Sequence, residues 1–260
     1  MLRLRLLLIA FALVACAQPA DEPVPSPDPI PALQSGALGE QVTAAGRIDS
    51  WPAGTTATIQ LAAQADPIGT VEADGRWSFT LTKPLSPPLG NTISAGDYFG
   101  VSSSDELDQP CAVATIQVIP ADAKINIVRS VNGVLIFGAA MRAQWSPEPL
   151  FPSLIRQQYD PASKRTRAVS LVYAEQSVRI EGQWVCRTYA PLTDDYVPPK
   201  PGGPFYYVTL SINLSLKPGW NEVLQTYQEV FRGDTLTQAR SVIVGGAGNP
   251  PIPWAYSGLR

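Results

Sequence analysis

Apolar and polar residues alternate one by one along most of the chain after residue 40, which is the pattern of half-buried β-strands. The stretch FYYVTLSINLSL shows it most clearly, because every second residue from Val208 to Leu216 is apolar. In RWSFTLT, which directly follows the turn pair Asp74-Gly75, tryptophan, phenylalanine and leucine alternate with serine and threonine. Strands at this spacing, with turn signals between them, are typical of β-sandwiches.

The pattern also suggests how the chain is divided. We expect further strands at 91–95 and 113–119, a boundary at Pro120, and a later hairpin at the turn pair Asn132-Gly133. The predicted fold class is all-β, with two β-sandwich-like domains after a signal peptide and a proline-rich linker. A single β structure of about 200 residues is the alternative. The expected ranges are 1–15 for the signal peptide, 16–36 for the linker, 37–119 for the first domain and 120–260 for the second.

The first sixteen residues, MLRLRLLLIAFALVAC, differ from the rest because they are basic and then continuously apolar. Arg3 and Arg5 precede an apolar run of about ten residues, which is too short to span a bilayer and fits the core of a signal peptide. The run ends at Cys16. An ordinary secretory signal with a chance cysteine, or a buried N-terminal helix, would explain the same composition.

The last four of these residues, LVAC, resemble the lipobox of bacterial lipoproteins. The resemblance implies cleavage after Ala15 and a diacylglycerol on the Cys16 thiol, with a further acyl group on its amine. It places the protein in the cell envelope, bound to a membrane through the lipid. Ala17, where an aspartate often marks inner-membrane retention, favours the outer membrane or the cell surface.

The segment that follows, AQPADEPVPSPDPIPALQSG, has proline at nearly every second position of its central part. Proline removes backbone donors and favours polyproline II, so neither a helix nor a sheet is expected there. At ~3.1 Å per residue, about twenty residues would reach roughly 60 Å from the membrane. The sequence therefore predicts an extended tether, or a plain disordered N-terminus if Cys16 is not anchored.

Composition limits the partners and the chemistry. The net charge of −3 becomes −5 once Arg3 and Arg5 leave with the signal peptide, which argues against nucleic acid or an anionic membrane surface as the main partner. Charged residues make up 16%, below the ~25% of typical soluble domains, while the chain contains 26 prolines. The absence of histidine excludes Ser-His-Asp and Cys-His catalysis and removes the commonest zinc ligand.

The chain contains three cysteines, and the lipid would take one of them. Cys111 and Cys186 remain, and a compartment outside the cytoplasm is oxidising, so we expect a disulfide between them. Two buried free cysteines are the alternative.

The stretch GTVEADGRWSFTLTKPL resembles the bacterial immunoglobulin-like repeats of surface proteins and, more loosely, carboxypeptidase regulatory-like domains. Both families have an Asp-Gly type of turn followed by an aromatic strand. The resemblance covers residues 37–119 and implies a β-sandwich with Trp77 and Phe79 in its core. The polar loop SAGDYFGVSSSDELDQPC is longer than these families usually have at that point.

Three groups of residues are candidates for sites. Acidic side chains in DYFGVSSSDELD could bind calcium, although their spacing is not that of an EF-hand and a solvated loop is the alternative. If Tyr206 shares the inward face of its strand with Val208, then Phe205 and Tyr207 face outward and could stack on a sugar or a partner, unless a loop covers them. The candidate calcium ligands are Asp97, Asp105, Glu106 and Asp108.

Paired carboxylates would support a hydrolase without a cofactor, as in glycosidases. The candidates for such a pair are Glu175, Glu181, Asp194, Asp195, Glu222 and Glu229. The leading expectation is a non-catalytic binding or structural module with an unknown protein or glycan ligand, no cofactor and no catalytic residues. A membrane-anchored hydrolase is the alternative.

Overall fold

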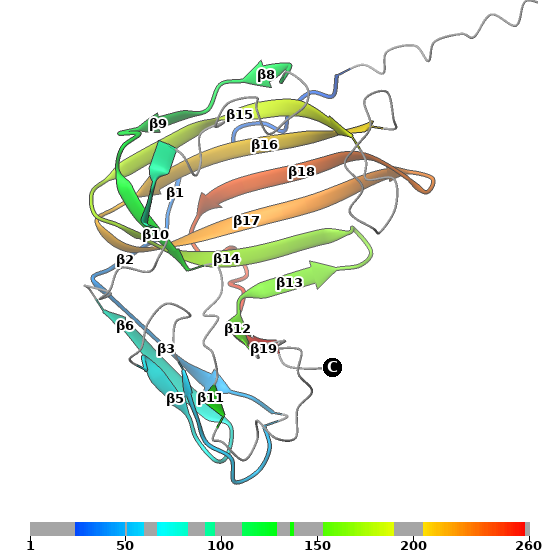
Figure 1. Cartoon of the computed structure of the whole chain (residues 1–260). Coiled ribbons are helices and arrows are strands. Elements are labelled where there is room, and N and C mark those ends of the chain that lie inside the picture. Colours follow the sequence, from blue (N-terminus) through cyan, green and yellow to red (C-terminus); the bar gives the residue numbers. More distant parts are fainter. Residues whose placement is uncertain are drawn as a thin grey trace, which may run out of the picture.

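The computed structural model describes residues 24–49, 51–59, 67–82, 92–96, 111–128, 136–137, 153–189 and 205–257. The prediction of an all-β protein is confirmed: apart from residues 95–96, which are helical, the described chain consists of strands, turns and extended segments. Figure 1 shows a large curled sheet with a small sheet at one side of it.

The large sheet has twelve strands, and most neighbouring strands are antiparallel. Its main order is β7-β10-β14-β17-β18-β16-β15-β8, with β16 and β18 parallel to each other. The twelve strands are β1 (Gln34–Ser35), β2 (Ala37–Gly39), β7 (Thr92–Ser94), β8 (Val113–Ala114), β9 (Gln117–Ile119), β10 (Lys124–Val128), β13 (Gln157–Asp160), β14 (Arg165–Ala174), β15 (Val178–Tyr189), β16 (Phe205–Leu216), β17 (Gly219–Arg232) and β18 (Thr235–Gly245).

The small sheet has five strands in the order β11-β4-β5-β6-β3, and two further strands form a separate pair. The strands of the small sheet are β3 (Gln41–Arg47), β4 (Ala57–Ile59), β5 (Gly69–Val71), β6 (Arg76–Thr82) and β11 (Ile136–Phe137). The pair consists of β12 (Ser153–Ile155) and β19 (Ala255–Ser257).

The large sheet curls because its two outer long strands, β14 and β15, are consecutive in the chain. Only residues 175–177 join Ala174 to Val178, so the two strands meet at that end, which we call the closed end. The strands separate towards the opposite end, which we call the open end; it contains the start of β14, the end of β15 and the β17–β18 turn (Figure 1). Side chains of β14, β15 and β16 share one buried cluster at the closed end, which identifies the face that carries them as the concave face.

The alternating residues of β16 explain this core. Ile212, Leu214 and Leu216 point to the concave face and are fully buried. Asn221, also fully buried, closes the adjoining β16–β17 turn: its side-chain amide donates to the carbonyl oxygens of Lys217 and Gly219 at 2.8 and 2.9 Å, and its Oδ1 accepts from the Lys217 N–H at 2.9 Å. The turn that joins the two longest central strands is therefore fixed by one side chain.

The small sheet packs against the convex face of the large one. Trp77 and Phe79, the expected core residues, are 4% and 2% exposed and share a cluster with Tyr173 and Trp220 of the large sheet. The sheets also exchange strands across Pro120: β8 and β9 precede it and pair with β15, whereas β11 follows it and pairs with β4. The expected boundary at 119/120 therefore does not separate the two sheets.

The end of the expected tether is part of the folded body. Residues 24–33 form no helix or strand, but they lie along the convex face of β16, and the chain then continues into β1 and β2. There β1 pairs with β16 and β2 with β17, which fills the space between these strands beyond the end of β18. We call residues 24–39 the strap. Residues 24–36 of the expected tether are thus attached to the large sheet.

Candidate functional site

The concave face changes character along the strands. At the closed end it is apolar and buried, whereas towards the open end it presents aromatic and hydrogen-bonding side chains from four neighbouring strands. Register places Trp184, Leu210, Ser241 and Tyr227 in one row across β15, β16, β18 and β17. We call the aromatic and polar members of this region the concave-face residues: Trp184, Tyr206, Gln225, Tyr227, Glu229 and Ser241.

Tyr227 and Glu229 form the most distinctive contact of this region. Two residues apart on β17, they point to the same face, and the Tyr227 hydroxyl donates to Glu229 Oε1 at 3.3 Å. Burial, followed by the negative charge and hydrogen bond of Glu229 and the nearby Tyr206, raises the pKa of Tyr227 from its ordinary value of 10.0 to about 12. The phenol is therefore neutral at physiological pH and remains a hydrogen-bond donor.

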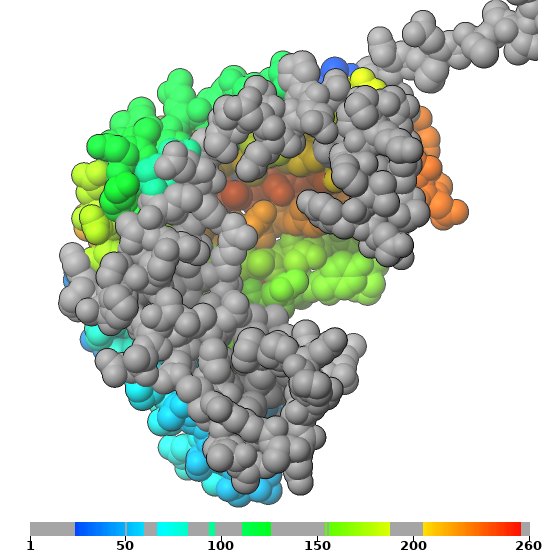
Figure 2. All heavy atoms as spheres, viewed as in Figure 1, coloured from blue at the N-terminus to red at the C-terminus, as the bar shows by residue number. Residues whose placement is uncertain are grey.

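This arrangement is suited to binding. Figure 2 shows the molecule hollowed over the strands that carry these residues, with β17 and β18 visible inside the hollow. Gln225 is exposed, while Trp184, Tyr206, Tyr227 and Glu229 are each half-buried. Aromatic surfaces beside an amide, a hydroxyl and a carboxylate can stack on a polar ligand and hydrogen-bond to it.

The described glutamates do not converge into a catalytic pair. Glu229 faces the concave side, whereas Glu222 lies seven residues away on the same strand and therefore faces the convex side. Glu181 is paired with Arg179 at 2.6 Å on the convex face of β15, and Glu175 lies in the turn between β14 and β15. The other two candidates, Asp194 and Asp195, lie outside the described residues.

Glu222 has a structural role in a buried ion pair. Arg156, which is 8% exposed, bonds to Glu222 through Nη1 and donates through Nε to the carbonyl oxygen of Ile252 at 2.8 Å. Its guanidinium also lies over the Trp254 ring, 5.6 Å from the centroid. These contacts attach the C-terminal segment to the convex face of β17, so both charged groups are engaged in holding the fold.

Cys111 and Cys186 come together as the sequence predicts, at disulfide distance and with their Cα atoms 4.0 Å apart. Cys186 lies on β15, and the Ala112 N–H donates to the Val185 carbonyl oxygen next to it. The pair therefore fastens the segment before β8 to β15 within the large sheet and does not link the two sheets.

Phe205 and Tyr207 lie on the convex face of β16, opposite to Tyr206 and Val208, as the alternation predicts. Their ring centroids are 5.7 Å apart, and the Arg187 guanidinium lies over the Phe205 ring at 3.3 Å. Tyr207 is only 8% exposed, so it is packed rather than presented to a ligand. Phe205 is half-buried.

The remaining candidates lie outside the described residues. They are Cys16 and the proposed calcium ligands Asp97, Asp105, Glu106 and Asp108. Within the part of the chain that the structure describes, no group of three or more metal-binding side chains occurs. The same part contains no helix with the length and apolar character needed to cross a membrane.

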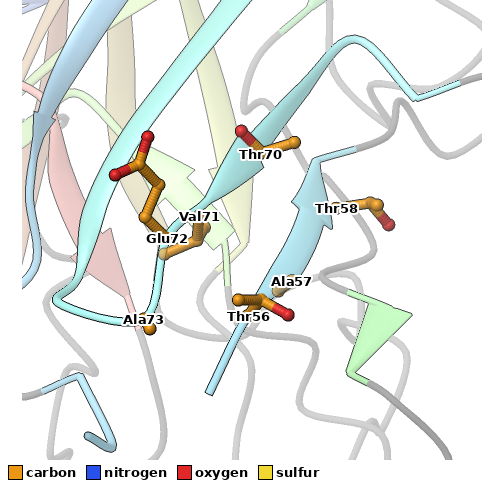
Figure 3. Close-up of a pocket in the computed structure, with 7 residues that line it drawn as sticks. All are labelled: Thr56, Ala57, Thr58, Thr70, Val71, Glu72 and Ala73. Carbon is orange, nitrogen blue, oxygen red and sulfur yellow. The ribbon is translucent and has the colours of Figure 1, made fainter. Parts of the chain in front are cut away.

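A surface hollow of about 420 Å³ lies beside β4 and β5 on the small sheet (Figure 3). Thr58 and Thr70, a cross-strand pair, contribute hydroxyls to it. Its one carboxylate, Glu72, is paired with Arg76 at 2.9 Å. The other lining residues are Thr56, Ala57, Val71 and Ala73. The hollow has fewer kinds of hydrogen-bonding group than the concave face and no aromatic side chain.

From the sequence, Glu229 is a candidate only as half of a catalytic pair, and neither Trp184 nor Tyr227 is a candidate site residue. The signal was present in QTYQE, where Gln225, Tyr227 and Glu229 alternate and must share a face. Comparison of the chain with protein-family models, with curated proteins and with solved structures found no match.

Proposed function

We propose that the protein is a lipid-anchored component of the bacterial cell envelope that acts as a non-catalytic binding module. Its ligand-binding surface is the concave face of the large sheet. The observation that carries the binding role is the contact between Tyr227 and Glu229 near Tyr206 on the concave face, in the same row across the sheet as Trp184. A neutral phenol donor, a carboxylate acceptor and aromatic faces together suit a hydroxyl-rich ligand, and we propose a glycan.

The anchor rests on the lipobox-like LVAC and on the basic and apolar residues before it. Three acyl chains on one cysteine give stable attachment, because each buried methylene contributes ~0.8 kcal/mol. The protein made in bacterial cells should incorporate radiolabelled palmitate and partition into detergent. The Cys16→Ser variant should do neither. Wild-type protein that stays unlabelled and soluble would refute the anchor.

The binding role is tested with the lipidated protein in detergent on an array of envelope glycans. Trp184→Ala and Tyr227→Ala should each reduce retention at least tenfold, because each removes a side chain of the concave face. Glu181→Gln is the matched control, since Glu181 lies on the convex face of the same sheet. The concave face would be refuted as a glycan site if the wild-type protein is not retained on any glycan. It would also be refuted if all three variants are retained as well as the wild type. If the protein instead captures another protein specifically and no glycan, the ligand of the concave face is a protein.

The anchored hydrolase that the sequence left open requires two convergent carboxylates. Glu229 on the concave face and Glu222 on the convex face do not form such a pair, and Glu222 is already bonded to Arg156. No observation among the described residues favours the hydrolase over binding.

A further inference from the structure

The strap fixes the direction in which the folded body leaves its anchor. The Ser211 hydroxyl donates to the Asp28 carbonyl oxygen at 2.7 Å, and the Asn213 side-chain amide donates to that of Pro31 at 2.8 Å. The Asp28 carboxylate lies 3.5 Å from the Arg240 guanidinium. Because Asp28 and Pro31 lie beside Ser211 and Asn213 in the same order, the strap runs parallel to β16.

It follows that lower-numbered strap residues lie nearer the open end, where β16 begins. Val24, the first described residue, belongs to the blue segment that starts at that end in Figure 1. Only the residues from Cys16 to Val24 separate this point from the proposed lipid. A fully extended chain spans at most ~3.6 Å per residue, so this segment reaches about 29 Å. The start of the strap, at the open end, is therefore held within about 29 Å of the membrane if Cys16 is lipidated.

The open end carries side chains suited to a membrane surface. The Lys164 ammonium lies 3.6 Å from the centroid of the Phe231 ring, and Arg187 lies over Phe205 in the same way. Tyr159, near the β13–β14 turn, is 59% exposed. Basic groups beside aromatic rings are typical of the interface between lipid headgroups and acyl chains.

Charge is distributed unevenly between the open end and the small sheet. At the β13–β14 and β17–β18 turns, Lys164, Arg165 and Arg232 are exposed together with Asp160 and Asp234. The Asp160 carboxylate accepts from the Ser163 hydroxyl and the Ala162 N–H, which lower its pKa and keep it ionised. Among the described side chains, these two turns carry three cations and two carboxylates, and the nearby Arg187 and Glu229 cancel each other. The described open end therefore has a net charge of +1, although the whole chain is negative.

The small sheet has the opposite balance at its exposed β5–β6 turn. There Arg76 is shared between Glu72 and Asp74, each 2.9 Å away. With its cross-strand neighbour Arg47 and the exposed Asp49, three carboxylates lie near two cations, a net charge of −1. An anionic membrane attracts the open end and repels this turn.

We propose that the open end of the large sheet rests on the anionic headgroups of the membrane that holds the anchor, with the small sheet directed away from it. The proposal rests on the lipid attachment proposed above. It goes beyond that attachment because it names the surface in contact, the lipid charge and the orientation. Each basic residue close to an anionic surface contributes about fivefold to association.

The test uses the full-length lipidated protein in vesicles that carry an energy-transfer acceptor on their headgroups. A fluorophore is attached to a cysteine in either Asp234→Cys, at the open end, or Asp74→Cys, on the small sheet. Both changes replace an exposed aspartate in a turn, so they are matched. Transfer should be several-fold higher from position 234 than from position 74 in vesicles that contain phosphatidylglycerol, and this difference should shrink in vesicles of phosphatidylcholine alone.

Charge reversal then tests the contact. Lys164→Glu with Arg165→Glu should lower transfer from position 234 to the phosphatidylcholine level. Arg47→Glu with Arg76→Glu, an equal change on the small sheet, should leave it unchanged. Two outcomes in protein that floats with the vesicles refute the orientation alone: equal transfer from both positions, or no effect of the Lys164→Glu/Arg165→Glu reversal. Protein that does not float with the vesicles refutes the anchor, and the orientation with it.

Discussion

Loss of the Arg156 guanidinium should destabilise the protein strongly, because it leaves Glu222 charged and largely buried. The side chains of the pair are 8% and 18% exposed. Removal of one partner from a buried pair costs about 3–5 kcal/mol, because the remaining charge keeps its desolvation penalty without its counter-charge. Arg156→Met also takes a donor from the Ile252 carbonyl oxygen, so we expect the upper part of this range. At roughly 2–4 °C per kcal/mol for a chain of this size, Tm should fall by about 10 °C or more.

Urea unfolding followed by tryptophan fluorescence is the assay, because Trp77 on the small sheet and Trp220 on the large sheet share one core. The double variant Arg156→Met/Glu222→Leu should recover most of the loss, since apolar groups of similar size replace both charges. Arg179→Met is the control: its pair with Glu181 is 61% and 42% exposed and should contribute less than about 1 kcal/mol. A loss of stability in Arg156→Met no larger than in Arg179→Met, or a double variant less stable than the single one, would refute a stabilising role for the buried ion pair.

Three further predictions concern the strap, the cysteine pair and the concave face. Gly36→Ala should destabilise the protein by about 1–3 kcal/mol, because the added Cβ would overlap the Glu222 carbonyl oxygen of β17. Ser35→Ala, at the exposed neighbouring position, should cost under about 0.5 kcal/mol, so equal urea midpoints for the two variants would contradict the prediction. The Cys111–Cys186 bond would close a loop of 75 residues, so its reduction should lower the unfolding free energy by up to ~4.5 kcal/mol. Two free thiols in denatured, unreduced protein would show that the bond does not form. Because folding raises the pKa of Tyr227 to about 12, the stability that Tyr227 contributes is present below pH ~10 and is lost towards pH ~12. In this pH window the unfolding free energy of Tyr227→Phe should change less with pH than that of the wild type. Identical pH profiles would contradict the raised pKa.

Period-two alternation identified the long strands, since it reports which side chains share a face within about ten residues. It missed the short strands β1, β2, β12, β13 and β19. It predicted that Val208 and its alternating neighbours form one apolar face, and it placed Phe205 and Tyr207 on the other. It could not reveal that β16 has β18 as a parallel neighbour, nor that β11 joins β4 across Pro120. Those pairings depend on distant registers, which local periodicity does not encode.

The candidate site was harder to predict for a related reason. Alternation gives the face of a side chain but not what covers that face, and both faces of β16 turned out to be partly covered. Tyr207 is buried on the convex side, while the half-buried Tyr206 lies on the concave side, near Tyr227. The cysteine pair was predictable because only two cysteines remained to pair once Cys16 was set aside.

The strap has a consequence for the order in which the protein can be made. Gln34 pairs with Leu214, and Asp28 bonds to Ser211, 183 residues further along the chain. The strap is therefore synthesised early but has no partners on β16 until nearly the whole chain has followed. Contacts at such separation make folding slow, since a long loop must close before any pairing stabilises it. The strap must stay unpaired while the rest of the chain is made, and the large sheet can be completed only when β16 to β18 have been synthesised.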